Sequence, residues 1–211
     1  MQLERQLDIP ERSSSITWDT LGWSRLSRQV FWLADGRRDV TKIAILLHKD
    51  AQLVKEAAYK LQQSGYMRLR RERKTLVMNP ALLKESFDMV APQKDAFARS
   101  FYERLFTDYP QTKPLFAQTD MRRQESSLMA TLAVVVAGVE RGENLVPTLQ
   151  QLGQKHKRYG ATADGYPLVG AALLETFHEY LGSRFTAEMQ SAWEEAYEII
   201  SVQMLEGAKT I

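Results

Sequence analysis

Three histidines and no cysteine limit the metal chemistry open to this chain of 211 residues. Without cysteine, disulfides, thiolate zinc sites, iron–sulfur clusters and a cysteine nucleophile are all excluded. His48 neighbours a lysine, and His178 lies between two glutamates on the polar side of a predicted helix, so we expect both side chains to be solvated. His156 alone follows a suitable apolar run in the second half of the chain. The sequence therefore indicates His156 as the candidate metal ligand.

The spacing of other residues relative to His156 suits a haem site. His156 comes 32 residues after Gln124 and 28 after Leu128, so an imidazole on one helix can face both residues from another helix. A haem needs an axial ligand, an apolar slot and a distal side whose polarity decides which gas binds. Tyr102 and Phe116, further upstream, complete the set of residues to which a role can be given.

The elements that must position these residues are helices. Apolar residues recur every three or four positions from Leu82 to Leu205, which predicts an all-α domain. Pro92 and Pro167 fall in first helical turns, and Thr186 is a suitable N-cap. The expected helices are Leu82–Met89, Gln93–Thr107, Arg123–Gly138, Leu145–His156, Pro167–Leu181 and Ala187–Leu205.

The first 80 residues have a different pattern. After a loose arm with a short extended piece over residues 1–20, we expect helices over Trp23–Ala34 and Val40–His48 and a third that Asp50 caps and Gly65 ends. Apolar and polar residues alternate over residues 66–70 and again over residues 74–78, on either side of residues 71–73, which predicts a β-hairpin. Three helices and a hairpin form a winged-helix-like domain, and Asn79-Pro80 divides the chain into domains 1–80 and 81–211.

Residues from about Leu82 to Leu205 resemble a bacterial globin of the single-domain or flavohaemoglobin type. Five short sequences near the start carry the resemblance: Phe101–Phe106, Lys113–Phe116, Thr119–Met121, Leu128-Met129 and Leu152–His156. Further ones follow in the same order: Tyr166–Leu174, Leu181-Gly182, Phe185-Thr186, Ala192-Trp193 and Tyr197. The resemblance implies a mainly α protein with a globin fold behind the winged-helix-like domain.

The resemblance also implies a role for each site residue. His156 is then the proximal ligand of haem b, Phe116 contacts the porphyrin, and Tyr102 is the distal tyrosine. Gln124 faces the bound gas, and Tyr166 matches a tyrosine of the proximal side. The remaining residues expected around the haem are Leu115, Leu128, Leu152, Ala161, Val169, Leu173 and Tyr197.

Tyr102 and Gln124 suit the binding of dioxygen. Dioxygen gains negative charge on ferrous iron whereas carbon monoxide gains little, and both side chains are neutral hydrogen-bond donors. Such a bond is worth about 1.5–3 kcal/mol in a buried site, so one donor can slow dioxygen release by roughly ten- to a hundredfold. The alternative is that Tyr102 is a core residue and Gln124 is solvated.

The sequence departs from the flavohaemoglobin pattern on the proximal side. The position expected for a glutamate that polarises the histidine holds Ala208, and Glu206 lies two places away, so we expect no strong polarisation. Ala161 stands where a bulkier valine is common, which leaves space beside the haem. With no second histidine on the distal side, a bis-histidine form is not expected.

The charge of the two parts differs. Residues 1–80 carry 15 basic and 9 acidic side chains, a net charge of +6, and residues 81–211 carry 13 and 17, a net charge of −4. The predicted hairpin holds Arg68, Arg70, Arg71, Arg73 and Lys74, which suit phosphate contacts in DNA. Docking to a protein, or formation of a homodimer, is the alternative for this domain.

These features leave more than one function open. The first is a cytoplasmic gas sensor or regulator, in which dioxygen, nitric oxide or carbon monoxide on the haem is reported by the N-terminal domain. The second is haem oxidoreductase chemistry such as nitric oxide dioxygenation, with electrons from a separate reductase because no G-x-G-x-x-G motif is present. Oxygen storage and a globin fold without haem are further alternatives. No apolar stretch reaches the ~20 residues of a membrane span.

Overall fold

The computed structural model describes residues 2–13, 23–47 and 49–210, and His48 lies outside these described residues. The chain divides into two compact units, one of Glu4–Thr75 and one of Leu76–Ile211 with the first three residues. Among the described residues, no helix is both long and apolar enough to cross a membrane.

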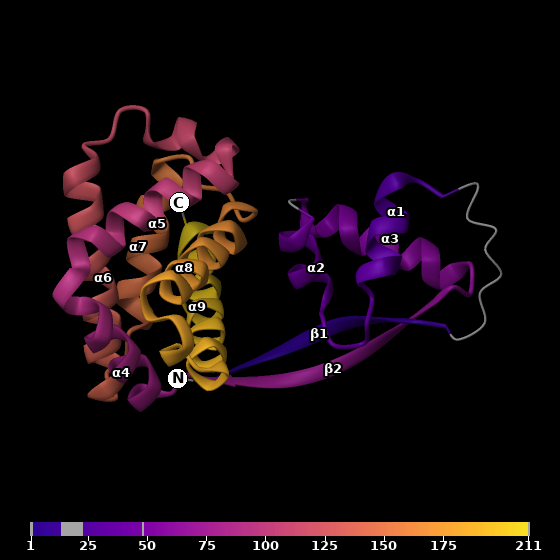
Figure 1. The fold of residues 1–211 in the computed structure, drawn as a ribbon, viewed down its shortest axis with the longest axis horizontal. Helices are drawn as coiled ribbons and strands as arrows, with labels where there is room; N and C mark the ends of the chain where they lie inside the picture. Colours follow the sequence, from indigo (N-terminus) through magenta and orange to yellow (C-terminus); the bar gives the residue numbers. More distant parts are fainter. Residues whose placement is uncertain (1, 14–22, 48, 211) are drawn as a thin grey trace. The chain divides into compact units, whose positions relative to one another are not determined.

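Three short helices form the core of the Glu4–Thr75 unit (Figure 1): α1 (Arg25–Leu33), α2 (Val40–Leu46) and α3 (Ala51–Gln63). The predicted caps are confirmed, since Asp39 accepts the backbone N–H groups of Thr41 and Lys42 and Asp50 accepts that of Leu53. Both α1 and α2 pack on α3. The shared core contains Val30, Phe31, Ala34, Val40, Ile43, Ala44, Val54, Ala57, Ala58, Leu61 and Met67.

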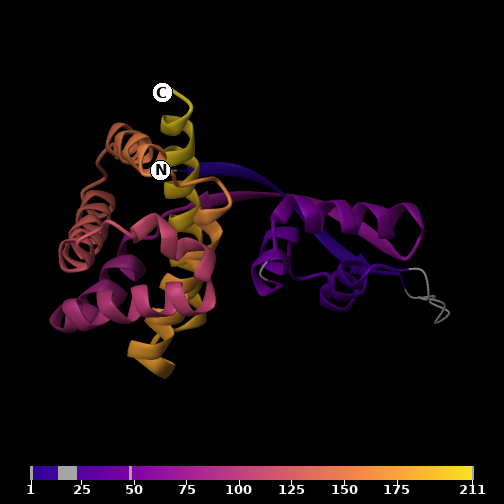
Figure 2. The same ribbon diagram turned by 90° about the horizontal axis from the view of Figure 1, so that it is seen from above.

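The predicted β-hairpin is wrong. Residues 67–77 form one continuous strand, β2 (Met67–Val77), which pairs with β1 (Gln2–Arg12) along the chain's first residues. The N–H of Ser13 donates to the carbonyl of Tyr66 at 3.0 Å, so the end of β1 meets the start of β2 and the pair is antiparallel. Figures 1 and 2 show the two strands side by side from both directions. The expected turn at residues 71–73 contains only arginine and glutamate, and with no Gly, Pro, Asn or Asp nothing there favours a reversal of the chain.

Two of the arginines expected on a DNA-binding wing make contacts within the chain. Arg70 donates to the carbonyl of Gly36 at 3.1 Å, and Arg71 donates to the Tyr59 hydroxyl at 3.1 Å and pairs with Asp8 at 3.6 Å. The side chains of Arg73 and Lys74 lie outside the described part of the chain. The basis for phosphate binding on a wing is therefore removed, because the wing does not form.

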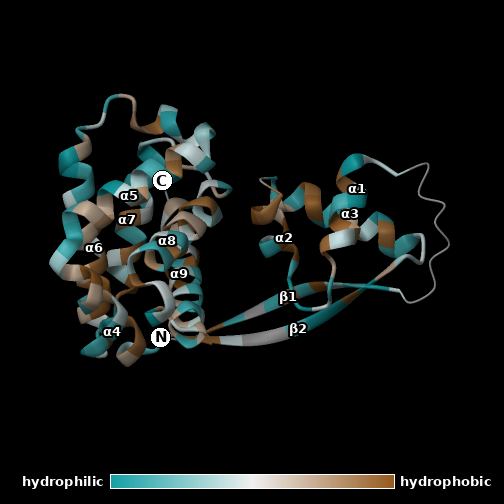
Figure 3. Ribbon diagram, viewed as in Figure 1, coloured by the Kyte–Doolittle hydropathy of each residue, from teal (hydrophilic) through white to brown (hydrophobic). Residues whose placement is uncertain are grey.

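After β2, the described part of the second unit consists of helices and the short loops that join them. Its elements are α4 (Pro80–Val90), η1 (Ala91–Gln93), α5 (Lys94–Asp108), η2 (Pro110–Phe116), α6 (Met121–Glu140), α7 (Val146–Arg158), α8 (Gly165–Leu181), η3 (Gly182–Arg184) and α9 (Ala187–Ala208). All six predicted helices are present, with ends that differ by at most three residues, and Thr186 caps α9 by accepting the N–H of Met189. Hydrophobic and hydrophilic residues alternate along these helices, as expected when one face is buried (Figure 3).

One hydrophobic core joins the helices of this unit. Trp193 of α9 is its centre: the indole is buried, lies 4.7 Å from the ring of Phe177 and donates to the Ser86 hydroxyl at 2.7 Å. A buried indole N–H needs such a partner, because an unsatisfied donor would cost the desolvation energy of the group. This bond therefore fixes α9 against α4.

Two glycines set the closest helix contact of the unit, between α7 and α9. A Cβ atom on Gly153 would overlap the backbone carbonyl of Met204, and one on Gly207 would overlap that of Gln150. The two backbones therefore touch where α7 crosses α9, which only glycine allows. His156 lies one turn beyond Gly153, so this contact sets the position of the candidate ligand.

Candidate haem site

The structure places His156 near the end of α7 with a geometry that suits metal binding. Its Nδ1 lies 2.9 Å from the carbonyl oxygen of Leu152, so Nδ1 carries the proton and donates, which leaves the lone pair of Nε2 available. Burial lowers the pKa of His156, against a smaller opposing effect of the Leu152 hydrogen bond. A lowered pKa keeps the ring neutral near pH 7, the form that binds a metal.

Tyr166 and Tyr197 lie on the same side as His156. The ring centroids of His156 and Tyr166 are 6.4 Å apart, and the Tyr197 hydroxyl donates to the backbone carbonyl of Tyr166 at 2.8 Å. Gly170 allows Tyr197 to approach α8, since a Cβ there would lie 2.7 Å from the tyrosine ring. Tyr197 therefore joins α9 to the first turn of α8, directly behind the histidine.

Glu206 does not join this group. Its carboxylate pairs with Lys209 at 2.6 Å, and its side chain is half exposed. Ala208, which occupies the position expected for that glutamate, accepts a hydrogen bond from Lys157 at its backbone carbonyl at 2.8 Å. Neither residue has a hydrogen bond to His156 or Tyr166 among the described contacts.

Tyr102 and Gln124 come together between α5 and α6. The amide Nε2 of Gln124, on α6, donates to the hydroxyl of Tyr102, on α5, at 3.0 Å. The hydroxyl oxygen thus acts as acceptor, which leaves its own proton free to donate to a third group. Burial raises the pKa of Tyr102 to about 12, so the phenol keeps that proton at any physiological pH.

Phe116 completes an aromatic group around Tyr102. The two ring centroids lie 5.6 Å apart in an edge-to-face arrangement, and Phe106 lies 5.3 Å from Phe116. Such arrangements are favourable and hold the rings in place. Phe116 ends η2 and is only partly buried, so part of its apolar surface stays open.

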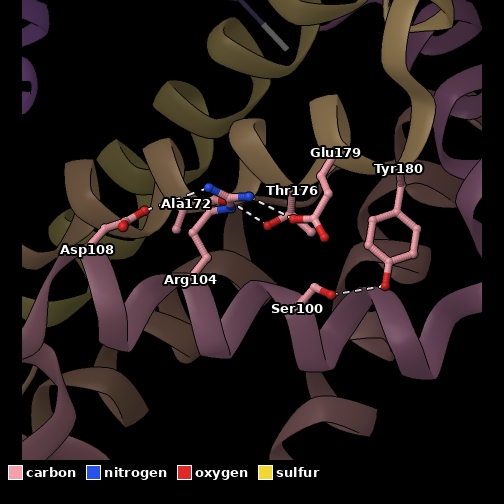
Figure 4. Close-up of polar contacts among 7 residues, drawn as sticks. All are labelled: Ser100, Arg104, Asp108, Ala172, Thr176, Glu179 and Tyr180. Atoms are coloured by element: carbon pink, nitrogen blue, oxygen red, sulfur yellow. Dashed lines mark hydrogen bonds and ion pairs between the residues drawn. The ribbon is translucent and has the colours of Figure 1, made fainter.

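Polar contacts hold α5, which carries Tyr102, against α8 (Figure 4). Arg104 pairs with Glu179 of α8 at 2.7 Å and with Asp108 at 3.8 Å, and the hydroxyls of Ser100 and Tyr180 lie 3.0 Å apart. The Nε of Arg104 is buried without a hydrogen-bond partner among the described residues. These contacts flank Tyr102 along the same helix. The local sequence does not reveal the two that join α5 to α8, because each joins residues 75 to 80 positions apart.

The other residues expected around a haem differ in how far they are buried. Leu128, Leu152 and Val169 are partly buried against the core of the unit, Leu173 is fully part of it, and Ala161 is half-buried after α7. Leu115 differs, because its side chain is 42 % exposed. A Cβ on Gly160 would lie 3.5 Å from Leu115, so η2 approaches the end of α7 at this point. Leu115 is therefore an edge residue rather than a core residue.

His178 is not the solvated side chain that the sequence predicted. Its Nε2 lies 3.0 Å from the amide oxygen of Gln190, and its ring meets Phe185 edge-on at 4.9 Å. The flanking glutamates suggested exposure, but α9 folds back over this face of α8. His178 thus has a structural role that the local sequence could not reveal.

The residues present fit a haem. His156 offers a neutral, oriented imidazole that could serve as an axial ligand, and Tyr102 and Gln124 offer two neutral hydrogen-bond donors. Partly buried apolar side chains of the same unit could line the slot. The donor set is that of a single nitrogen ligand with no thiolate.

Comparison with known protein families assigns the helical part of the chain to one family. The model of the globin family matches residues 99–204, just over half of the chain. The chain belongs to the globin family, and this membership implies haem as its cofactor.

The curated relatives it resembles are flavohaemoproteins. The chain is 29% identical over 122 residues to a flavohemoprotein of Bacillus subtilis, covering 57% of this chain and 31% of that protein. A flavohemoprotein of Oceanobacillus iheyensis is 31% identical over 122 residues, covering 57% and 30%. The chain therefore spans about a third of the length of the curated relatives it matches.

Two solved structures have the same fold. A bacterial globin from Campylobacter jejuni matches with a TM-score of 0.55 and 24% identity, over 62% of this chain and 94% of that one. An engineered carbene transferase from Rhodothermus marinus, described as a putative nitric oxide dioxygenase, matches with a TM-score of 0.56 and 25% identity, over 64% and 96%.

Proposed function

We propose that this chain is a haem b protein that binds dioxygen and nitric oxide on iron held by His156. The observation that carries the proposal is the pair formed by Tyr102 and Gln124, because two neutral donors in contact are suited to a ligand that gains negative charge. When bound, the haem would supply an iron that coordinates a diatomic gas and whose own oxidation state can change.

Each residue of the site would have its own role around the haem. His156 would bind the iron, and the hydrogen bond from its Nδ1 to the Leu152 carbonyl orients the imidazole ring. Gln124 holds the Tyr102 hydroxyl so that the phenolic proton points to the distal space, and the raised pKa keeps that proton in place. Phe116 and the leucines exclude water, which strengthens each of these hydrogen bonds.

We further propose that the reaction is a nitric oxide dioxygenation, in which dioxygen and nitric oxide are combined to nitrate. The resemblance to flavohaemoproteins and to a putative nitric oxide dioxygenase supports this reaction, and the distal donors suit it. The chain matches about a third of the length of these relatives, and the proposed reaction needs electrons from a reductase.

The proposal is tested by adding haem, a reductase and nitric oxide to the purified protein. We expect a Soret band in the purified protein and nitrate formed in proportion to nitric oxide consumed under air. A protein with a Soret band that forms no nitrate would overturn the reaction, and a protein that takes up no haem would overturn the whole proposal.

A gas sensor remains the second candidate, and one observation favours it. Glu4–Thr75 forms a compact unit with a hydrophobic core of its own. A globin does not need such a second unit in order to bind a gas. If this unit reports the state of the haem, its amide hydrogen exchange should change when carbon monoxide is added to the ferrous protein. Unchanged exchange throughout Glu4–Thr75 would exclude sensing through this unit.

A further inference from the structure

One face of α1, in the Glu4–Thr75 unit, carries side chains that are not part of the buried core. Arg25, Arg28, Gln29 and Trp32 are spaced by three, four and seven residues, which places them on the same side of a helix. The buried residues of α1 fall at other positions of the helix. This face is therefore left for contacts outside the core of the unit.

The side chains of this face line a hollow of about 450 Å³, together with Leu33 and Leu47. Leu47 is the C-cap of α2, so the hollow lies where α1 meets the end of α2. Leu33 and Leu47 are partly buried and pack against the core of the unit. The hollow therefore has an apolar base and room for a large apolar side chain.

Trp32 is the most exposed apolar residue of the hollow. It is 55 % exposed, which leaves a large apolar surface in contact with water. The guanidinium carbon of Arg12 lies 5.9 Å from the centre of the indole, and the ring of Phe31 meets the indole edge-on at 5.9 Å. These contacts hold the indole in place before a partner binds, which reduces the entropy lost on binding.

Two arginines give the hollow a positive charge. Arg25 and Arg28 both line it and are exposed, and none of its described lining residues is acidic. Within the part of the chain that the structure describes, neither arginine forms an ion pair with a carboxylate. Arg28 donates to the backbone carbonyl of Trp23 at 2.9 Å, which orients the guanidinium and leaves its charge in place. The hollow therefore favours a negatively charged partner.

The hollow suits a segment of another protein better than a free small molecule. Sites for small molecules enclose most of the surface of their ligand, whereas Trp32 and both arginines are exposed. Tryptophan and arginine are also the residues that contribute most to binding at protein interfaces. Arg25 and Arg28 lie about one helical turn apart, so two carboxylates with the same spacing on a partner helix can meet both.

We propose that this hollow is the docking site for an acidic amphipathic helix of a partner protein. The helix inserts a large apolar side chain against Trp32 and the two leucines, and it places carboxylates beside the two arginines. Complementary charge orients the helix, and the buried apolar side chain supplies most of the affinity. The inference goes beyond the proposed haem function and does not depend on it, because every residue involved belongs to the Glu4–Thr75 unit.

The experiment uses the full chain and a fluorescently labelled peptide that is stapled as a helix. The peptide carries two glutamates one helical turn apart and a leucine one turn further along. One control peptide has lysines in place of the glutamates, and the other has alanine in place of the leucine. Binding is measured by fluorescence anisotropy at low and high salt. We expect saturable binding of the acidic peptide and binding at least about tenfold weaker for each control peptide.

A charge reversal tests the two arginines. In the double variant Arg25→Glu with Arg28→Glu, the affinity for the acidic peptide should fall about tenfold or more at low salt and much less at high salt, because salt screens the charges. The matched control is Lys60→Glu with Arg68→Glu, which reverses two exposed cations of α3 and β2 that do not line the hollow. The control should bind within about twofold of the original protein.

The variant Trp32→Ala tests the apolar part of the hollow. Loss of an interface tryptophan should weaken binding of the acidic peptide about tenfold or more. Leu53→Ala is the matched control, because Leu53 is 50 % exposed in the same unit and does not line the hollow. Both substitutions remove exposed side chains, so the unit should stay folded, and amide hydrogen exchange of its core checks this.

Three outcomes of the peptide measurements would overturn the inference. They are no saturable binding of the acidic peptide, equal affinity for the lysine peptide, and equal losses in the hollow variants and their controls. Light scattering provides a further test of the occupant. If Trp32→Ala halves the molar mass of the protein in solution, a second copy of this chain occupies the hollow and the proposed partner helix is wrong.

Discussion

The two sides of the candidate haem site are built by different means. On the distal side, Tyr102 and Gln124 meet through one hydrogen bond between side chains of α5 and α6. On the proximal side, His156 owes its position to backbones in contact, where Gly153 of α7 and Gly207 of α9 leave no room for a Cβ. A distal substitution should therefore change how a ligand is held, whereas a proximal one should change whether the site exists.

The largest expected effect is that of His156→Ala. Loss of the single imidazole ligand should abolish haem binding, seen as loss of the Soret band from the purified protein. His178→Ala is the matched control, because His178 bonds to Gln190 and lies away from this group of residues. If the His156 variant kept its Soret band and its carbon monoxide spectrum, the assignment of the proximal side would be wrong.

Gly153→Ala tests the backbone contact between α7 and α9. The added methyl group overlaps the Met204 carbonyl, so the helices must separate, and we expect the free energy of unfolding to fall by about 3 kcal/mol. Chemical denaturation measures the change. Gly165→Ala is the control, since a Cβ at Gly165 meets nothing within 4 Å; equal effects at both positions would contradict the close approach.

Tyr102→Phe tests the distal pair. Loss of the phenolic donor should speed dioxygen release by roughly ten- to a hundredfold, and release of carbon monoxide should change far less. Flash photolysis or stopped flow of the ferrous protein measures both rates. Tyr180→Phe removes a hydroxyl that contacts Ser100 of the same helix α5 but not Gln124, and it should leave dioxygen release unchanged. Equal rates in the two variants would mean that Tyr102 does not reach the ligand.

Tyr197→Phe should have the smallest effect. It removes the 2.8 Å hydrogen bond to the Tyr166 carbonyl, so we expect a loss of about 1 kcal/mol in the free energy of unfolding, with haem retained. Thermal unfolding of the ferric protein provides the measurement. A variant that lost its haem would show that Tyr197 acts directly on the cofactor rather than through α8.

Local sequence predicted the helices well, because their signals are local. The caps Asp39, Asp50 and Thr186 each accept a backbone N–H two or three residues away, so type and spacing alone reveal them. The hairpin failed for the opposite reason. Alternating residues indicate a strand but not its partner, and β2 pairs with β1 from the other end of the unit rather than with itself.

The same division holds for the site. Residue types and their order along the chain were enough to identify the candidate side chains: one imidazole, two uncharged donors and a set of apolar residues. The folded chain was needed to see that the Gln124 amide donates to the Tyr102 hydroxyl, that His178 contacts Gln190, and that Glu206 pairs with Lys209. Residue type fixes what a group can donate or accept, but which groups meet depends on helix crossings set by contacts such as Gly153 with Met204, between residues about 50 positions apart.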